Sequence, residues 1–318
     1  MSGSHQHGHE HGHAHRATLT TRAALASISI ALFLLGLKIF AVWQTGSVAM
    51  LGSLADTGLD LLASLVTLYG VRFAAQPADS EHRFGHGKAE ALAALFQVFV
   101  IALSALAIFY RAIERLMKGE VTAHADYGIG VSVIAIVATV ALLAYQRYVI
   151  ARTNSVAITA DHVHYQSDVL LNIAVIAALA LDQYAGIVWA DPVFGIGIAA
   201  ALLIGAWRAS TQAVDQLMDR EWPEEKRQHF LSVAARHPEL AGIHDLRTRT
   251  SGTQDFVQFH VWMAPDMTVA DAHRVIDEVE DKLAQEFPAT EILIHIDPEG
   301  QVDKEGVLPS HLAEEATR

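Results

Sequence analysis

The chain has 318 residues, of which 52% are hydrophobic and 18% charged, and its formal net charge is −13. This composition is too apolar and too poor in charge for an ordinary soluble enzyme of this length. The chain has no cysteine, which excludes disulfides and thiolate ligands and disfavours copper(I) or iron–sulfur chemistry. The acidic balance without clustered Lys and Arg also excludes a nucleic-acid partner.

Histidine alternates with other residues along the first 15 positions. The residues concerned are His5, His7, His9, His11, His13 and His15. Such a tract cannot bury a core and binds metal ions weakly. We interpret residues 1–20 as a His-rich cytoplasmic tail that collects metal. An expression tag is the alternative, although tags are usually uninterrupted runs of histidine.

Six apolar stretches follow, each long enough for the roughly 20 residues that a membrane-spanning helix needs. They lie at about residues 22–43, 47–73, 90–116, 124–150, 158–183 and 186–211. An even number of spans puts both termini on one side of the bilayer. Most basic residues near the span ends lie on the side of the termini, which predicts that the termini are cytoplasmic. Residues 21–211 are therefore expected to form an all-α bundle of six transmembrane helices.

The second and fifth predicted spans carry acidic residues. Asp56 and Asp60 are four positions apart, and so are His164 and Asp168, so each pair lies on one face of its helix. If the two faces meet, three carboxylates and an imidazole form a tetrahedral set that suits zinc. A purely structural role is disfavoured because each acid in mid-bilayer costs about 2.5–3.5 kcal/mol. His164 is the expected proton carrier, since an unperturbed imidazole titrates near neutral pH.

Three further polar residues lie inside predicted spans. Lys38 is expected to extend its amine from the first span towards a membrane surface. Asp161 and His162 lie near the cytoplasmic end of the fifth span, where they could line an access path for the ion.

The loop between the second and third spans contains a compact group of ligand-type residues. Asp79, His82 and His86 lie within eight positions, and Gly85 and Gly87 allow the backbone to turn there. Such a group could close around a metal ion. Two solvated histidines in an exposed loop are the alternative reading.

After residue 211 the long apolar stretches end, and shorter segments with helix-like or strand-like spacing of apolar residues follow. A helix is predicted from Pro223 to about Arg236, then strands at 243–250 and 256–263, a helix at 269–287 and a strand at 291–297. The order αββαβ predicts a small α+β domain at residues 212–298, ferredoxin-like as in metallochaperones. Residues 299–318 are polar and expected to be disordered.

Histidines and one acid gather on the predicted outer face of this small sheet. His295 and Asp297 are two apart on the last strand and share a face, while Ile292, Ile294 and Ile296 point into the core. His260 lies on the outer face of the preceding strand. His244, at the head of the first strand, and His273, on the second helix, complete the group. Metal ligation and simple solvent exposure both fit this pattern.

Four sequence motifs together resemble those of the cation diffusion facilitator family of metal exporters. They are G-S-L-A-D-T-G-L-D in the second span, F-G-H-G-K-A-E before the third, H-Y-Q-S-D in the fifth and H-D-L-R-T-R in the C-terminal domain. The resemblance covers about residues 20–298. It implies a homodimer in the bacterial inner membrane that exchanges Zn²⁺, or a similar divalent ion, for protons.

The resemblance also implies roles for individual residues. It assigns Asp56, Asp60, His164 and Asp168 to the transport site, and Asp79, His82 and His86 to a loop site. His244, His260, His273, His295 and Asp297 are assigned to a cytoplasmic two-metal site that stabilises the dimer. Lys88 and Asp219 match positions that the family uses for a charge pair near the membrane at the dimer interface.

Other functions remain as alternatives. A membrane metalloenzyme is disfavoured because the chain has no H-E-x-x-H or G-x-S-x-G motif. A membrane metal sensor that does not transport is a third hypothesis, and a passive channel differs from an exporter only in lacking proton coupling. Among substrates, Cd²⁺, Fe²⁺, Co²⁺ and Mn²⁺ are alternatives to Zn²⁺, because ligand type alone does not set selectivity. No organic cofactor is expected.

Overall fold

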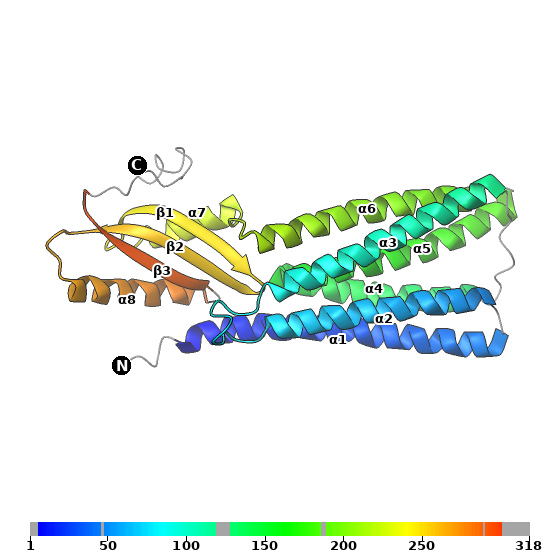
Figure 1. The fold of residues 1–318 in the computed structure, drawn as a ribbon, viewed down its shortest axis with the longest axis horizontal. Helices are drawn as coiled ribbons and strands as arrows, with labels where there is room; N and C mark the ends of the chain where they lie inside the picture. The colour runs from blue at the N-terminus through cyan, green and yellow to red at the C-terminus, as the bar shows by residue number, and fades with distance from the viewer. Residues whose placement is uncertain (1–5, 46–47, 119–127, 186–188, 289, 301–318) are drawn as a thin grey trace. The chain divides into compact units, whose positions relative to one another are not determined.

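The structure is a computed structural model that describes residues 6–45, 48–118, 128–185, 189–288 and 290–300 (Figure 1). The chain divides into two compact units, one of residues Ala17–Val214 and one that contains Asp215 onwards together with the first 16 residues.

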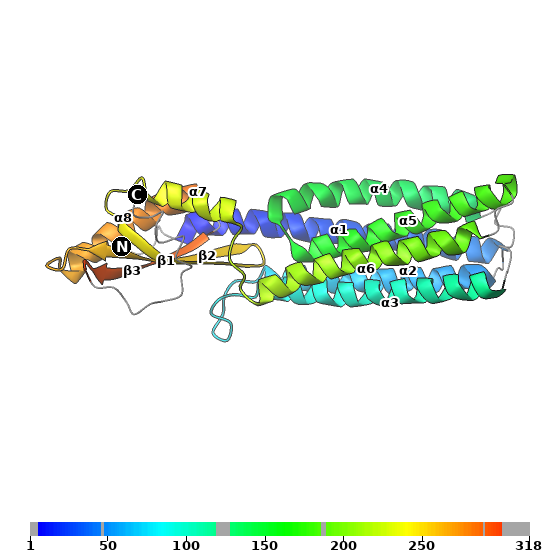
Figure 2. The same ribbon diagram turned by 90° about the horizontal axis from the view of Figure 1, so that it is seen from above.

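Six long helices lie lengthwise beside one another in the first unit, as both Figure 1 and Figure 2 show. They are α1 (Gln6–Thr45), α2 (Val48–Ala74), α3 (Ala89–Lys118), α4 (Gly128–Thr153), α5 (Val156–Ala185) and α6 (Ala190–Leu217). The predicted helical bundle is thus confirmed. Helix α1 begins at Gln6, well inside the segment interpreted as a tail, but the side chains of the six alternating histidines lie outside the described residues.

Four of these helices contain a stretch long and apolar enough to cross a membrane. The stretches are Arg16–Phe40, Ala89–Met117, Val133–Thr153 and Pro192–Leu217. Helices α2 and α5, which carry the ligand candidates, are not among the four found in the described residues.

Small residues fill the interior of the bundle, and large apolar ones cover its outside. Ala24, Ala94 and Ala160 are fully buried, whereas Phe99 and Trp207 are mostly exposed. Small side chains let helices approach closely where lipid gives no hydrophobic drive between them. Large apolar side chains on the outside match a lipid environment, so this distribution is that of a membrane protein.

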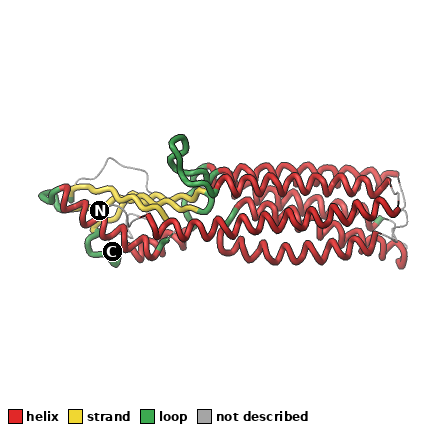
Figure 3. Tube along the Cα trace, turned by 90° about the horizontal axis from the view of Figure 1, so that it is seen from below, coloured by secondary structure: helices red, strands yellow, loops and turns green. Residues whose placement is uncertain are grey.

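The C-terminal unit contains a three-stranded sheet and two helices, drawn in yellow and red in Figure 3. The elements are α7 (Glu224–Ala234), β1 (Ala241–Ser251), β2 (Gln254–Met263), α8 (Val269–Glu286) and β3 (Thr290–Pro298). Strand β2 pairs antiparallel with β1 and parallel with β3. The predicted order αββαβ is confirmed.

Both helices of this unit share one hydrophobic core with one face of the sheet. Phe230 of α7, Val279 and Leu283 of α8, and Phe259 of β2 are all fully buried in that core. Because side chains alternate along a strand, Gln258 and His260 lie on the other face. The two helices thus leave the second face of the sheet for polar side chains.

Candidate metal sites

Asp60, His164 and Asp168 form a cluster inside the bundle, called here the membrane cluster. Each offers one ligand atom within 4.8 Å of the other two. The closest pair is His164 Nε2 and Asp60 Oδ1, 3.0 Å apart, which joins α5 to α2. The His164 side chain is 4% exposed and that of Asp60 23%, so Asp60 is the less buried of the two. The arrangement can hold a cation between two helices.

The fourth predicted member, Asp56, lies on α2, but its side chain is outside the described residues. Lys38 of α1 differs from the expectation that its amine extends towards a membrane surface. Its Nζ donates a hydrogen bond of 2.5 Å to Thr57 Oγ1 on α2, and its charge reaches the Asp168 carboxylate. A fixed cation near the membrane cluster is a feature that the sequence pattern did not reveal.

Hydrogen bonds hold α5 in place around the cluster. The hydroxyl of Tyr165, next to His164 in sequence, donates to Ser27 O at 3.1 Å and lies 2.9 Å from Ser64 Oγ. One turn further along, Asn172 Nδ2 donates to Asp168 O at 2.7 Å. The bonds of Tyr165 join α5 to α1 and α2, whereas that of Asn172 lies within α5.

Asp79, His82 and His86 form the loop cluster, again with ligand atoms within 4.8 Å of one another. Asp79 Oδ1 is 3.4 Å from His82 Nδ1, and Asp79 Oδ2 is 3.3 Å from His86 Nε2. His86 is buried against Phe73 with ring centroids 4.7 Å apart, while Asp79 and His82 are exposed. Gly85 has a φ of 77°, which explains the glycine at this turn.

Two backbone N–H groups point at the Asp79 carboxylate. The N–H of His82 donates to Oδ1 at 2.6 Å and that of Glu81 at 2.8 Å. These bonds, with that from His82 as the largest cause, hold the pKa of Asp79 below its ordinary value. A carboxylate that stays ionised beside two imidazoles has the chemistry of a metal ligand, so the loop residues fit a divalent ion.

His244, His260 and Asp297 form the C-terminal cluster on the outer face of the sheet, with ligand atoms within 4.8 Å of one another. Asp297 Oδ2 lies 2.8 Å from His260 Nδ1 and 3.2 Å from His244 Nε2. Burial acts to raise the pKa of Asp297, but the hydrogen bond with His260 and the nearby imidazoles hold it below the ordinary value.

The tautomer of His244 favours metal binding. Its Nδ1 lies 2.8 Å from Gly242 O, so Nδ1 carries the proton and Nε2 keeps its lone pair. Nε2 is buried and makes no hydrogen bond with any described residue. A buried nitrogen with a free lone pair facing a carboxylate is the arrangement expected of a ligand.

A bulge in β1 aims these side chains. The pairing of β1 with β2 shifts between Ala241 and His244 and again between His244 and Arg247. Gly242 and Asp245 both have positive φ, at 60° and 47°. The shift brings Asp245 Oδ2 to 3.7 Å from His260 Nε2. Asp245 is therefore a candidate ligand that strict strand alternation places on the opposite face from His244.

Two other residues predicted to belong to the C-terminal metal site, His295 and His273, lie outside the C-terminal cluster. His295 is mostly exposed, with its ring 4.5 Å from that of His260 and its Nε2 3.4 Å from Asp297 Oδ1. It borders the C-terminal cluster. His273 is on α8, whose buried face packs against the opposite side of the sheet, and its partner is Asp277 at 3.4 Å. The structure does not bring His273 into the cluster, and its assignment stays a prediction.

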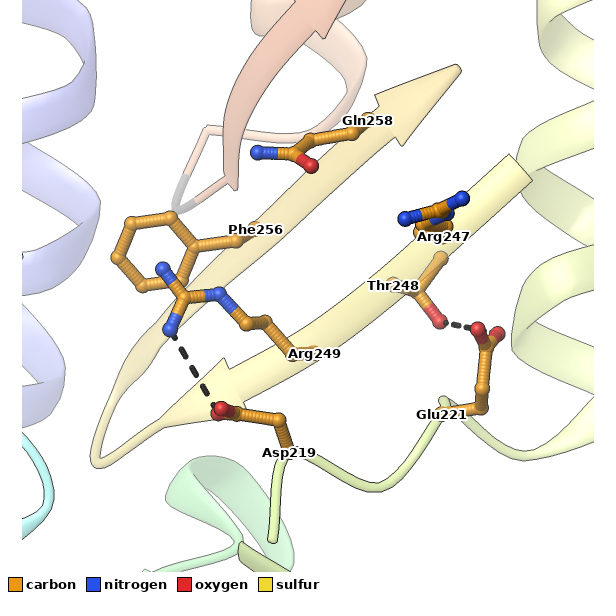
Figure 4. Close-up of a pocket in the computed structure, with 7 residues that line it drawn as sticks. All are labelled: Asp219, Glu221, Arg247, Thr248, Arg249, Phe256 and Gln258. Carbon is orange, nitrogen blue, oxygen red and sulfur yellow. Dashed lines mark hydrogen bonds and ion pairs between the residues drawn. The ribbon is translucent and has the colours of Figure 1, made fainter. Parts of the chain in front are cut away.

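Asp219 lines a pocket of about 230 Å³ on the C-terminal unit, shown in Figure 4. The pocket is lined by Asp219, Glu221, Arg247, Thr248, Arg249, Phe256 and Gln258. Asp219 Oδ1 is 3.5 Å from Arg249 Nη1, and Thr248 donates to Glu221 at 3.0 Å. Lys88 immediately precedes α3. Its predicted pairing with Asp219 at a dimer interface stays a prediction.

Both units of the chain match family models of known proteins. Residues 24–218 match the cation efflux transmembrane domain, and residues 222–299 match the cytoplasmic domain of cation efflux proteins. The chain is 45% identical over 290 residues to the cation-efflux pump FieF of Salmonella newport (strain SL254), covering 91% of this chain and 96% of that protein.

The chain is also similar to a second relative and to a solved structure. FieF of Klebsiella pneumoniae subsp. pneumoniae is 44% identical over 286 residues, covering 89% of this chain and 94% of that protein. A solved structure of CzrB is 36% identical and covers 25% of this chain and 99% of that chain, with a TM-score of 0.24.

The two units of the chain thus match the transmembrane and the cytoplasmic domain of cation efflux proteins. The match to FieF covers nearly all of this chain and nearly all of FieF. The predicted resemblance is confirmed, and proteins of this kind move cations across a membrane and are not enzymes. With its ligand-type residues gathered between two helices of such a bundle, this chain belongs to the cation diffusion facilitator family of cation efflux transporters.

Proposed function

We propose that the protein exports a divalent metal ion, with zinc as its main substrate, across the bacterial inner membrane in exchange for protons. The observation that carries the proposal is the membrane cluster of Asp60, His164 and Asp168 between α2 and α5. Mixed imidazole and carboxylate ligands suit zinc and cadmium, whereas manganese prefers sites built from oxygen alone. The fourth ligand in this proposal is Asp56, one helical turn before Asp60 on α2.

Proton exchange follows from the charge of this site. With Asp56 as the fourth ligand, three carboxylates and a neutral imidazole leave the site occupied by Zn²⁺ with a net charge of about −1. When the ion leaves, the negative charge of the carboxylates remains in a poorly solvated place, which favours the entry of protons. His164 is the proposed proton carrier because its Nε2 already faces the Asp60 carboxylate at 3.0 Å. Metal and protons then occupy the same residues in turn.

Alternating access fits ligands that are divided between two helices. Asp60 belongs to α2, while His164 and Asp168 belong to α5. A displacement of one helix relative to the other changes the ligand geometry and opens the site to one side. In this proposal all six helices span the bilayer, and both termini are cytoplasmic, as is the C-terminal domain.

The loop and C-terminal clusters are proposed to bind resident zinc that regulates transport and stabilises a homodimer. His244, His260 and Asp297 face away from the helices of their domain, so a second copy of the chain can approach that surface. Zinc bound there neutralises acidic repulsion between the two domains. Binding that is tighter in the closer arrangement then makes metal a regulator as well as a substrate.

The test is zinc flux into proteoliposomes that contain the purified full-length protein, with and without an imposed pH gradient. Zinc flux that depends on the gradient and disappears in Asp168→Asn is the expected result. Asp215→Asn is the matched control, because Asp215 lies on α6 outside the membrane cluster and pairs with Arg220. Flux that ignores the gradient would identify a channel or uniporter. If another divalent ion is transported and zinc is not, the proposed site stands but zinc is not the substrate.

A further inference from the structure

A second polar group lies in the bundle, apart from the membrane cluster. Its centre is Asp161 of α5, which is fully buried together with Ser27 of α1 and Gln146 of α4. Ser27 Oγ donates to Asp161 Oδ2 at 2.6 Å, and Gln146 Nε2 donates to the same oxygen at 2.8 Å. Gln146 Nε2 is also 3.1 Å from Ser27 Oγ. Three helices thus meet at one carboxylate oxygen.

The other oxygen of this carboxylate has no partner. Asp161 Oδ1 is buried and makes no hydrogen bond within the described part of the chain. No lysine or arginine among the described residues pairs with Asp161. A buried acceptor without a donor is rare in folded proteins and calls for a specific explanation, such as an ion.

The position of Asp161 is informative as well. It follows the start of α5 at Val156 by five residues, a rise of roughly 7.5 Å, and precedes His164 by three, a rise of roughly 4.5 Å. Asp161 therefore lies between the end of the bundle at which α5 begins and the membrane cluster.

A purely structural network would not need this carboxylate. Hydrogen bonds among polar side chains can join helices within a membrane, and Ser27 and Gln146 are suited to that role. An asparagine at position 161 could accept the same two hydrogen bonds without placing a charge in the bundle. The carboxylate costs free energy there unless a cation compensates it.

The ligands available at this place are oxygen atoms. They comprise the Asp161 carboxylate, the Ser27 hydroxyl and the Gln146 amide, whose oxygen faces Asp161 after a half-turn of the amide group. The amide oxygen as assigned is 3.2 Å from His162 Nδ1. One carboxylate with neutral oxygens binds a divalent ion less tightly than carboxylates with an imidazole, which suits a place that an ion must leave again.

We propose that Asp161, Ser27 and Gln146 form a transit site for the divalent cation, through which the ion passes between the cytoplasmic end of the bundle and the membrane cluster. This inference rests on the proposed function. The ion contacts Asp161 only on its way from the cytoplasmic end of the bundle to the membrane cluster. Asp161 is not a ligand of the ion once the ion is bound in that cluster. Its removal therefore raises the zinc concentration needed for transport and leaves the maximal rate largely intact.

The test uses everted membrane vesicles, in which the cytoplasmic side faces outwards, with initial zinc uptake measured against zinc concentration. Asp161→Asn is expected to raise the half-saturating zinc concentration about tenfold, as the loss of one charged contact does, with the maximal rate within about twofold of wild type. Asp215→Asn is the matched control, because it removes a carboxylate on α6 that pairs with Arg220 outside the transit site. Its half-saturating concentration stays within about twofold of wild type.

Asp161→Glu separates charge from folding, because it keeps the carboxylate and is expected to resemble wild type more closely than Asn does. An unchanged half-saturating concentration in Asp161→Asn would overturn the transit site. So would equal effects of Asn and Glu at position 161, since packing would then be the cause. Wild-type vesicles that take up no zinc would instead refute the proposed function.

Discussion

Replacement of Asp297 by asparagine tests whether the C-terminal cluster binds metal. Asp297 is the carboxylate of the C-terminal cluster, and its Oδ2 faces both imidazoles. Asparagine keeps the shape and can still accept a hydrogen bond from His260. The change therefore removes the negative charge with little disturbance of the sheet.

The size of the effect follows from binding linkage. Changes around a metal ligand typically weaken metal binding 10- to 100-fold, so loss of the carboxylate ligand itself is expected to weaken zinc binding at least about 100-fold. Zinc at 100 times the wild-type Kd stabilises the domain by about 2.7 kcal/mol. The same concentration equals the Kd of the variant, where the stabilisation is only about 0.4 kcal/mol.

Hydrogen exchange of the β2 and β3 amides in the full-length protein measures this local stability. Zinc should increase protection about 100-fold in wild type and about 2-fold in Asp297→Asn. Asp266→Asn, in the exposed turn after β2, is the matched control and should respond like wild type. An equal gain in protection for Asp297→Asn and wild type would show that Asp297 is not a ligand.

Three further predictions concern other properties. Gly242→Ala should destabilise the C-terminal domain by more than the about 1–2 kcal/mol that a φ of 60° alone costs, because the added Cβ would lie 2.2 Å from the Trp262 ring. Equilibrium binding assays should also show weaker zinc binding, because the change displaces His244. In metal-free protein the lowered pKa of Asp297 means that its stabilising contribution is present above about pH 4 and lost as pH falls through the lowered value. The difference in β3 protection between wild type and Asp297→Asn should therefore vanish at low pH. Lys38→Met, which removes a cation bonded to Thr57 beside the membrane cluster, should tighten zinc binding in calorimetric titrations, and weaker binding would contradict a charge effect.

The spacing of apolar residues along the sequence was sufficient to predict the helices and strands of the fold. The last predicted helix, at 269–287, is observed as Val269–Glu286, and the strand at 291–297 as Thr290–Pro298. The first strand begins at Ala241, two residues before its predicted start at Ile243. Long runs of apolar residues, and the regular alternation of apolar with polar residues, are properties of the local sequence. They can therefore be recognised without knowledge of the tertiary contacts.

The candidate sites were less accessible to sequence reasoning. Helical spacing alone places Asp60 on one face and His164 with Asp168 on another, but it does not say which helices face each other. Asp245 could not be predicted, because its position depends on a bulge that breaks the alternation of β1. The bulge arises from positive φ values, and only the glycine at 242 hints at one in the sequence.

The two kinds of cluster differ in how easily they can release an ion. His244, His260 and His295 lie on adjacent strands and face each other in a fixed register of His244 with His260 and His260 with His295. Their separation cannot change unless backbone hydrogen bonds of the sheet break. The membrane cluster instead joins α2 to α5 through side chains, so a relative shift of two helices suffices to pull Asp60 away from His164. A site on rigid strands suits a resident ion, and a site divided between helices suits an ion that must leave.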